Sequence, residues 1–230
     1  MRFACIVSAA GRGERFGGDV PKAFQPLGGR PMLDHSLTAV GHHPDVELLV
    51  VAAPGDRLRD AEAIASAASL PIPVIVVAGG ATRGASVRAA LAAVPAGIEG
   101  VLVHDAARPF VPSAVVDAVV STVAAGAAGV VPGVPVIDTI KQVNDHDVVI
   151  TTPPRDQLRA IQTPQGFQVA VLHEALAHSD DGATDDAGMV ERSGWPVSVV
   201  PGHPDAFKIT TPDDRMRAEE LLHRRAGHVQ

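Results

Sequence analysis

The sequence predicts an α/β protein built on a single doubly wound, mostly parallel β-sheet. Short apolar runs rich in β-branched residues alternate with segments of helical period over residues 3–136. The apolar runs are continuous, as is typical of strands that are buried on both faces. Neighbouring parallel strands require right-handed crossover connections, and the alternating helical segments supply them.

The expected elements are short segments bounded by turn residues. The strands are expected at Phe3–Ser8, Val46–Ala52, Pro73–Ala78, Val101–His104, Gly129–Val136, Val197–Val200 and Phe207–Thr210. The helices between the first five strands are expected at Pro31–Val40, Asp56–Ala68, Thr82–Ala93 and Pro112–Ala125. A largely solvated amphipathic helix is expected over Asp213–Arg225.

Residues 137–160 depart from this alternation. Two alternating runs, Thr139–Val143 and Val148–Thr152, flank the turn-rich residues 144–147 and predict a β-hairpin. The hairpin has too few large apolar residues to form a core of its own. We therefore treat residues 1–230 as one domain with 137–160 as a protruding β-arm, which packs on its own body or reaches a partner subunit.

Composition and charge restrict the class of protein. The chain has 230 residues, of which 46% are hydrophobic and 20% charged, as in a soluble globular protein. A net charge of −7 argues against nucleic-acid binding. No apolar run approaches the roughly 20 residues of a membrane-spanning helix, and the apolar N-terminus is too short for a signal peptide. A cytoplasmic enzyme without a membrane partner is the expectation, and the lone Cys5 excludes an internal disulfide.

A glycine-rich segment, residues 8–18, directly follows the first expected strand. Small residues at the carboxyl end of a parallel strand let backbone N–H groups approach an anion closely. The segment fails the dinucleotide-binding fingerprint, because Phe16 stands where its third glycine is required. It also fails the P-loop pattern, because Asp19 follows Gly18.

The same segment matches a third pattern, Gly-x-Gly-x-Arg followed by Pro-Lys, in Gly11, Gly13, Arg15, Pro21 and Lys22. This pattern is typical of nucleotidyltransferases, which take a nucleoside triphosphate and release pyrophosphate. Such reactions depend on positioning and on neutralising charge on phosphate oxygens, which arginine and lysine do. The alternative is a solvated surface loop, and the net charge of +3 over residues 1–30 favours the anion site.

An acidic residue, Asp105, closes the fourth expected strand. At that strand end it would face the glycine-rich segment and could hold Mg²⁺ on the phosphates of a nucleotide. Taken alone, Asp105 would be read as a helix cap or a solvated side chain, but the basic segment beside it favours the metal site. We expect the neighbouring His104 to orient Asp105 or to pack, rather than to catalyse.

A set of motifs, in this order and spacing, makes nearly the whole chain resemble the 2-C-methyl-D-erythritol 4-phosphate cytidylyltransferases. The glycine-rich segment alone marks only a superfamily, whereas the complete set is specific. The motifs are residues 9–15 with Pro21-Lys22, residues 79–87, residues 104–109, Asp138-Thr139, Arg155 with residues 162–165, Thr184-Asp185-Asp186, and Lys208 with Thr210.

The resemblance implies a Rossmann-like nucleotidyltransferase fold and a reaction in isoprenoid precursor biosynthesis, the MEP pathway. CMP would pass from CTP to 2-C-methyl-D-erythritol 4-phosphate, which gives 4-diphosphocytidyl-2-C-methyl-D-erythritol and pyrophosphate. The attacking group is a phosphate monoester that is mostly dianionic at pH 7, so no general base is required. One departure is Ala81, which stands where some relatives have Asp.

The resemblance also implies a role for each matching residue. Arg15 and Lys22 would be catalytic, and Asp105 would bind Mg²⁺. The nucleotide would be held by Ala9, Ala10, Gly11, Gly13, Gly80, Arg83 and Ser86. The polyol phosphate would be positioned by Arg155, Lys208, Thr139, Arg108, Thr163 and Thr184. The 137–160 arm would form a homodimer and place Arg155 in the active site of the partner.

Three other functions remain to be distinguished. A ribitol 5-phosphate cytidylyltransferase shares the chemistry, although Ala107 is Val in the form typical of those enzymes. An NAD(P)-dependent oxidoreductase shares the sheet but not the fingerprint. A catalytically silent nucleotide-binding module would not need the cations at Arg15 and Lys22.

Overall fold

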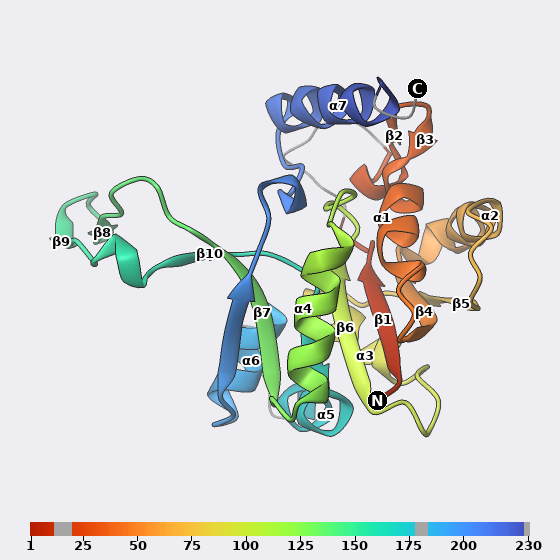
Figure 1. The fold of residues 1–230 in the computed structure, drawn as a ribbon, viewed down its shortest axis with the longest axis horizontal. Coiled ribbons are helices and arrows are strands. Elements are labelled where there is room, and N and C mark those ends of the chain that lie inside the picture. Colours follow the sequence, from red (N-terminus) through yellow and green to blue (C-terminus); the bar gives the residue numbers. More distant parts are fainter. Residues whose placement is uncertain (12–19, 178–183, 228–230) are drawn as a thin grey trace.

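The computed structural model describes residues 1–11, 20–177 and 184–227. Its main sheet has eight strands in the order β10-β7-β11-β6-β1-β4-β5, with β12 pairing β7 off this path. The strands are β1 (Phe3–Ser8), β4 (Val46–Ala53), β5 (Val74–Ala78), β6 (Gly100–Asp105), β7 (Gly129–Pro135), β10 (Arg159–Ile161), β11 (Gln165–Gln168) and β12 (Val197–Pro201). Figure 1 shows this sheet in the centre of the molecule with helices in front and behind.

The pairing is mostly parallel, as expected. The strand pairs β1–β4, β1–β6, β4–β5 and β7–β12 are parallel. Strand β11 lies antiparallel between β6 and β7, and β10 lies antiparallel to β7. The predicted α/β class with one doubly wound sheet is confirmed, with an antiparallel insertion that the sequence pattern did not indicate.

Alternation along β1 divides the core into two layers, because successive side chains of a strand point to opposite faces. Phe3, Cys5 and Val7 pack on one face with the apolar sides of α1 (Met32–Gly41), α2 (Leu58–Ala67) and α4 (Ser113–Ala124). Ala4 and Ile6 pack on the other face with α3 (Arg83–Leu91), α5 (Val169–Ala177) and α6 (Asp186–Arg192). Helices on both faces are what a doubly wound sheet requires.

Two further pieces complete the body. Strands β2 (Pro26–Leu27) and β3 (Arg30–Pro31) form a small hairpin just before α1. Helix α7 (Pro212–Gly227) contacts β2, and its Ala218 and Leu221 join a third apolar cluster with Leu27 and Phe110. The expected C-terminal helix is therefore confirmed. None of the helices in the described part of the chain is long and apolar enough to cross a membrane.

The strand expected at Phe207–Thr210 is wrong. This segment lies between a 3₁₀ turn (Pro204–Ala206) and α7, and it is not part of any sheet. Its apolar character has another cause, because Ile209 is fully buried in the third cluster. A single backbone bond, from Ile209 N–H to the Ala107 carbonyl at 2.9 Å, fastens the segment to the loop after β6.

The predicted β-hairpin is confirmed, although it is shorter than expected. Strands β8 (Gln142–Val143) and β9 (Val149–Thr151) pair antiparallel. Figure 1 shows this hairpin far from the sheet, at the end of the 137–160 arm. The arm carries six exposed large apolar side chains: Ile137, Ile140, Val143, Val148, Val149 and Ile150. The outer part of the arm, residues 137–152, is therefore exposed, whereas Arg159 and Ala160 at its end pair with β7 in the main sheet.

Candidate active site

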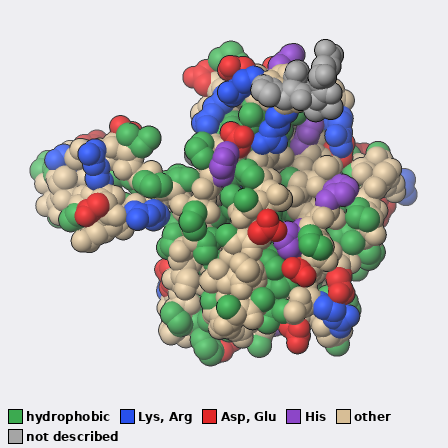
Figure 2. All heavy atoms as spheres, in the orientation of Figure 1, with side chains coloured by type: hydrophobic (Ala, Val, Ile, Leu, Met, Phe, Trp, Pro, Cys, Tyr) green, Lys and Arg blue, Asp and Glu red, His purple; other side chains and the backbone are tan. Residues whose placement is uncertain are grey.

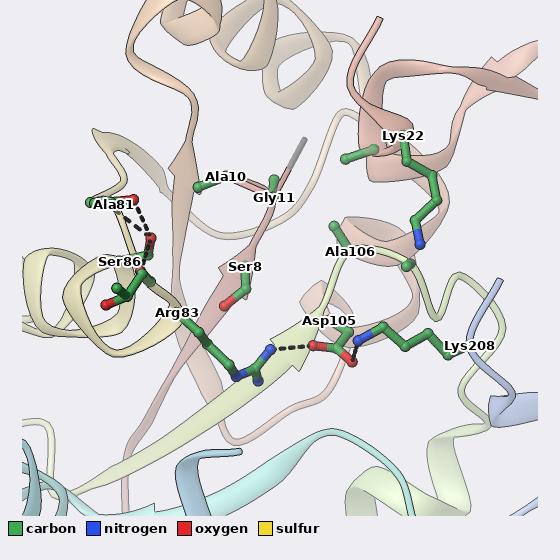
Figure 3. Close-up of a pocket in the computed structure, with 15 residues that line it drawn as sticks. Ser8, Ala10, Gly11, Lys22, Ala81, Arg83, Ser86, Asp105, Ala106 and Lys208 are labelled. Atoms are coloured by element: carbon green, nitrogen blue, oxygen red, sulfur yellow. Dashed lines mark hydrogen bonds and ion pairs between the residues drawn. The ribbon is translucent and has the colours of Figure 1, made fainter. Parts of the chain in front are cut away.

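A cavity of about 320 Å³ lies at the carboxyl ends of β1, β5 and β6. Figure 3 shows its walls, which come from segments far apart in the sequence. The sequence-predicted residues on these walls are Ala9, Ala10, Gly11, Lys22, Gly80, Arg83, Ser86, Asp105 and Lys208. Open α/β sheets bind their ligands at this edge, where the loops after parallel strands converge.

The loop after β5 leaves room for close approach of two backbone segments. A Cβ atom at Gly79 would collide with Ala10, and one at Gly80 would collide with Ala85. The loop is held by Ser86, whose Oγ accepts a hydrogen bond from Gly80 N–H at 3.1 Å. Thr82 caps α3 by accepting from Ala85 N–H at 3.1 Å. The glycines therefore allow close packing at the cavity wall, and their own N–H groups are used within the protein, Gly79 to the Ala53 carbonyl at 2.8 Å and Gly80 to Ser86.

Three cations surround the carboxylate of Asp105 at the end of β6. Arg83 Nη1 lies 2.6 Å from its Oδ1, whereas Lys208 Nζ lies 3.0 Å and Arg108 Nε 3.3 Å from its Oδ2. Burial by itself would raise the pKa of Asp105, but the charges of Arg83, Lys208 and Arg108 outweigh it and hold that pKa well below its usual range. Asp105 is therefore an anion at every physiological pH.

Asp186, which is not among the predicted site residues, positions Arg83. Its carboxylate is fully buried and accepts from Arg83 Nε at 3.0 Å and Nη2 at 2.7 Å. Burial raises the pKa of Asp186, and Arg83 opposes that effect. The guanidinium thus spans two carboxylates, because its remaining nitrogen, Nη1, donates to Asp105 in the cavity. The signal for this role was present in the Thr184-Asp185-Asp186 motif.

The same motif begins α6. Asp185 is the N-cap of α6, accepts from Gly188 N–H at 2.9 Å, and also accepts from Gln165 Nε2 at 2.7 Å. These bonds fix the helix start on which Asp186 sits. Thr184, the residue of the motif predicted to contact substrate, is exposed and does not line the cavity.

His104 and Thr163 form a buried hydrogen-bonded pair behind Asp105. Thr163 Oγ1 accepts from Asp105 N–H at 3.0 Å and lies 3.0 Å from His104 Nδ1. Since the hydroxyl proton is then available to Nδ1, the other ring nitrogen carries the hydrogen and donates to the Arg108 carbonyl at 3.1 Å. Burial lowers the pKa of His104 to about 4, so the ring is neutral near pH 7. His104 orients the end of β6 through Thr163 and Arg108, in line with the expectation.

The C-terminal segment closes the opposite wall. Lys22 Nζ donates to the Ile209 carbonyl at 2.6 Å, and Arg108 Nη1 donates to the Ala206 carbonyl at 2.8 Å. These bonds bring Lys22 and Lys208 to one side of the cavity, as Figure 3 shows. Residues from the two ends of the chain are therefore neighbours in the site.

Some predicted residues do not line this cavity. Thr139 and Arg155 are exposed on the arm, where Arg155 Nη1 donates to the Ile137 carbonyl at 2.9 Å. Within one chain they do not join the other site residues, and only a second subunit could bring them there. Gly13 and Arg15 lie outside the described residues.

The residues present are compatible with a magnesium ion that a nucleotide brings with it. Among the described residues no cluster of three or more acidic, His or Cys side chains could hold a metal, and Asp105 is the only acid on the cavity wall. Mg²⁺ is often bound through one or two carboxylates with substrate phosphates supplying other oxygens. Both Asp105 oxygens carry cationic partners, so the ion would share the carboxylate with Arg83, Arg108 and Lys208 or displace one of them.

Comparisons with known proteins agree with one another. A family model described as 2-C-methyl-D-erythritol 4-phosphate cytidylyltransferase (IspD) matches residues 3–224. A relative with that name from Frankia casuarinae is 52% identical and covers 97% of this chain and 82% of its own length. The structure of the Thermus thermophilus protein of the same name is 35% identical, with a TM-score of 0.76 over 97% of this chain and all of that one. A 4-diphosphocytidyl-2C-methyl-D-erythritol synthase from Anaerococcus prevotii is 27% identical, with a TM-score of 0.84 over 96% of this chain and 98% of that one.

Proposed function

The chain belongs to the 2-C-methyl-D-erythritol 4-phosphate cytidylyltransferase family, and from this we infer the reaction that it catalyses. It transfers CMP from CTP to 2-C-methyl-D-erythritol 4-phosphate in the MEP pathway of isoprenoid precursor biosynthesis. The observation that supports this assignment on the chain itself is the cavity, where Lys22, Arg83 and Lys208 gather beside Asp105 and glycine-lined backbone. Such a wall suits a polyanionic nucleotide.

The reaction is an in-line displacement at the α-phosphorus of CTP. An oxygen of the acceptor phosphate forms the new bond to that phosphorus, the bond to the bridging oxygen breaks, and pyrophosphate leaves with the electron pair. Two anions must meet, so stabilising the equatorial oxygens is the main task of the site. We assign this task to Lys22, which reaches the cavity, and to Arg15 in the glycine-rich segment.

The remaining roles divide between the walls of the cavity. The backbone of residues 9–11 and 80, with Ser86, would hold the nucleotide, and Arg83 would lie against it. Mg²⁺, if bound at Asp105 and the triphosphate, would neutralise charge on the phosphate oxygens. Lys208 and Arg108 would position the polyol phosphate, because both cations contact the Asp105 carboxylate. Thr163 is buried and holds the Asp105 backbone, so it would act on the acceptor through Asp105.

We further propose that the enzyme is a homodimer in the cytoplasm, where a nucleoside triphosphate is available. Arg155 and Thr139 are exposed on an arm that carries six exposed large apolar residues and leaves its own body. An arm that inserts into a partner would bury these apolar side chains. It would also bring Thr139 and the positively charged Arg155 to the acceptor side of the neighbouring site. Thr184, which precedes the Asp185 cap of α6 and does not line the cavity itself, would still contact the acceptor.

The direct test is pyrophosphate release with Mg²⁺, each of the four nucleoside triphosphates, and either 2-C-methyl-D-erythritol 4-phosphate or ribitol 5-phosphate. We expect release only with CTP and the methylerythritol phosphate. Release with ribitol 5-phosphate alone would overturn the acceptor, whereas no release with any pair would favour a silent nucleotide-binding module. Binding of NAD(P)H in a parallel titration would support an oxidoreductase instead.

A further inference from the structure

Ser8 is the last residue of β1 and lies at the wall of the cavity. It pairs in register with Asp105 on β6 and lines the cavity wall. Figure 3 shows its hydroxyl on the side of the Arg83 side chain. Ser8 thus lies between Ser86 of α3 and Asp105 at the end of β6.

The Ser8 hydroxyl is buried and has no hydrogen-bond partner within the protein. Among the residues that the structure describes, only two buried side-chain atoms are in this position, Ser8 Oγ and Asp186 Oδ1. Other buried serines differ, since Ser36 Oγ donates to the Ala106 carbonyl at 2.8 Å and Ser86 Oγ to the Thr82 carbonyl at 2.9 Å. A buried hydroxyl without a hydrogen-bond partner lowers the folding stability, so we expect a ligand to supply the missing partner of the Ser8 hydroxyl.

The charges around Ser8 indicate what that ligand is. Lys22, Arg83 and Lys208 share the wall with Ser8, so the space in front of it favours an anion. A serine hydroxyl donates one hydrogen bond, and an anionic phosphate oxygen is a strong acceptor. Asp186, whose orphan oxygen can only accept, cannot serve such an anion while it is ionised.

We propose that the Ser8 hydroxyl is a further nucleotide-binding group, which donates to a phosphate oxygen of the bound nucleoside triphosphate. This inference rests on the proposed function, because it takes CTP as the ligand of the cavity. The proposal predicts two opposite effects of the hydroxyl. Without ligand, the unpartnered hydroxyl lowers the folding stability of the protein, whereas with the nucleotide bound it raises the affinity. Removing the hydroxyl therefore separates binding from stability.

The test compares Ser8→Ala with the wild type by calorimetric titration of CTP and of cytidine, in the presence of Mg²⁺, together with thermal unfolding. The dissociation constant for CTP is expected to rise about tenfold, as for loss of one hydrogen bond to a charged group. Cytidine, which has no phosphates, should bind equally to both proteins. The melting temperature should be unchanged or higher, because no hydrogen bond within the protein is lost.

Two further variants serve as controls. Ser8→Cys keeps a group of similar size with a weak donor, so it should weaken CTP binding as Ser8→Ala does. Ser193→Ala removes a hydroxyl that donates to the Met189 carbonyl at the end of α6, away from the cavity wall, and should leave CTP binding unchanged.

The possible negative results distinguish the proposed function from the proposed role of Ser8. A wild-type protein that neither binds nor turns over CTP overturns the proposed function. CTP binding by the wild type with an equal constant for Ser8→Ala overturns only the Ser8 proposal, and so does a lower melting temperature with unchanged binding. An equal loss of cytidine and CTP affinity overturns the assignment to phosphate.

Discussion

At the scale of the residue, the site depends on how charge is balanced around Asp105. The carboxylate is paired with three cations, and one of these, Arg83, is held in turn by the buried Asp186. Breaking a buried pair by removing one partner leaves an uncompensated charge, so these groups stabilise the site as a set. The phosphates of a ligand can replace the Asp105 carboxylate as the partner of these cations. The cations are therefore suited to pair with Asp105 in the free protein and with a substrate in the complex.

Lys22→Ala tests whether the charge at this position acts in the transition state. Its kcat is expected to fall by about 10²–10³-fold, by analogy with the loss of one preorganised donor to a developing anion. Arg15→Ala should have a similar effect. Steady-state pyrophosphate release measures the rate, and circular dichroism checks that the fold is retained. The matched control is Arg57→Ala, which removes an exposed cation paired with Asp60 and should leave kcat unchanged. A near-wild-type kcat for Lys22→Ala would exclude the catalytic role.

At the scale of the element, helix α7 begins directly after the segment that holds Lys208 and fixes its end. The helix begins with a reciprocal cap, in which Thr211 Oγ1 accepts from Asp214 N–H at 3.2 Å and Asp214 Oδ2 accepts from Thr211 N–H at 2.8 Å. Asp214 also accepts from the N–H and the hydroxyl of Thr210, each at 2.8 Å. Burial by itself would raise the pKa of Asp214, but these hydrogen bonds hold it below its usual range.

Asp214→Asn is therefore expected to destabilise the protein in a pH-dependent way. A carboxyl whose pKa is depressed in the folded state stabilises it above the unfolded pKa, near 4, and that contribution is lost as pH falls. We expect a loss of about 1 kcal/mol at pH 7 from the weakened cap, with a smaller difference between the two proteins at pH 3. Urea unfolding at both pH values measures it, with Asp213→Asn in the same helical turn as the control. An equal difference at pH 7 and pH 3 would contradict this origin.

At the scale of the whole molecule, the feature of the described chain that leaves the body is the outer part of the 137–160 arm, residues 137–152, all of which are exposed. Figure 2 shows it as a separate lobe joined to the body by a narrow neck, with apolar and charged side chains on its surface. Ile137 is 84% exposed and Ile150 is 60% exposed, although both are large apolar side chains. Such an apolar surface on an extended segment is typical of an interface between subunits.

The oligomeric state tests this interpretation. Sedimentation at micromolar concentration should give the mass of a dimer for the wild type. Ile150→Asp places a charge on the apolar arm and should give a monomer with an intact fold and a strongly reduced turnover with CTP and the methylerythritol phosphate, because Arg155 no longer reaches a partner. Met216→Asp adds the same charge at an exposed apolar position on α7 and should remain dimeric. A monomeric wild type with full activity would refute the shared site.

The elements that could be predicted are the strands and helices whose buried faces produce a regular pattern of apolar residues in the sequence. The bounds of β1 agree with the prediction, and those of β4 and β5 differ by one residue, because continuous apolar runs mark strands buried on both faces. Strand β11 was missed because its four residues include Gln, Gly and Phe in no strand-like alternation, and its pairing is set by β6 and β7. Helix α6 was missed for a related reason, since it has seven residues and owes its start to the Asp185 cap.

The sequence by itself was enough to predict the fold class and the hairpin arm, because strand burial follows a local pattern, whereas the site residues that its motifs name stay predictions. The convergence of Lys22, Asp105 and Lys208 was decided only in the tertiary structure, since contacts between residues so far apart in the chain leave no local pattern. The same holds for the role of Asp186 and for the unpartnered hydroxyl of Ser8, which depend on what lies, or does not lie, within hydrogen-bonding distance. Bringing such distant groups together requires the sheet, whose parallel strands carry their carboxyl ends to one edge.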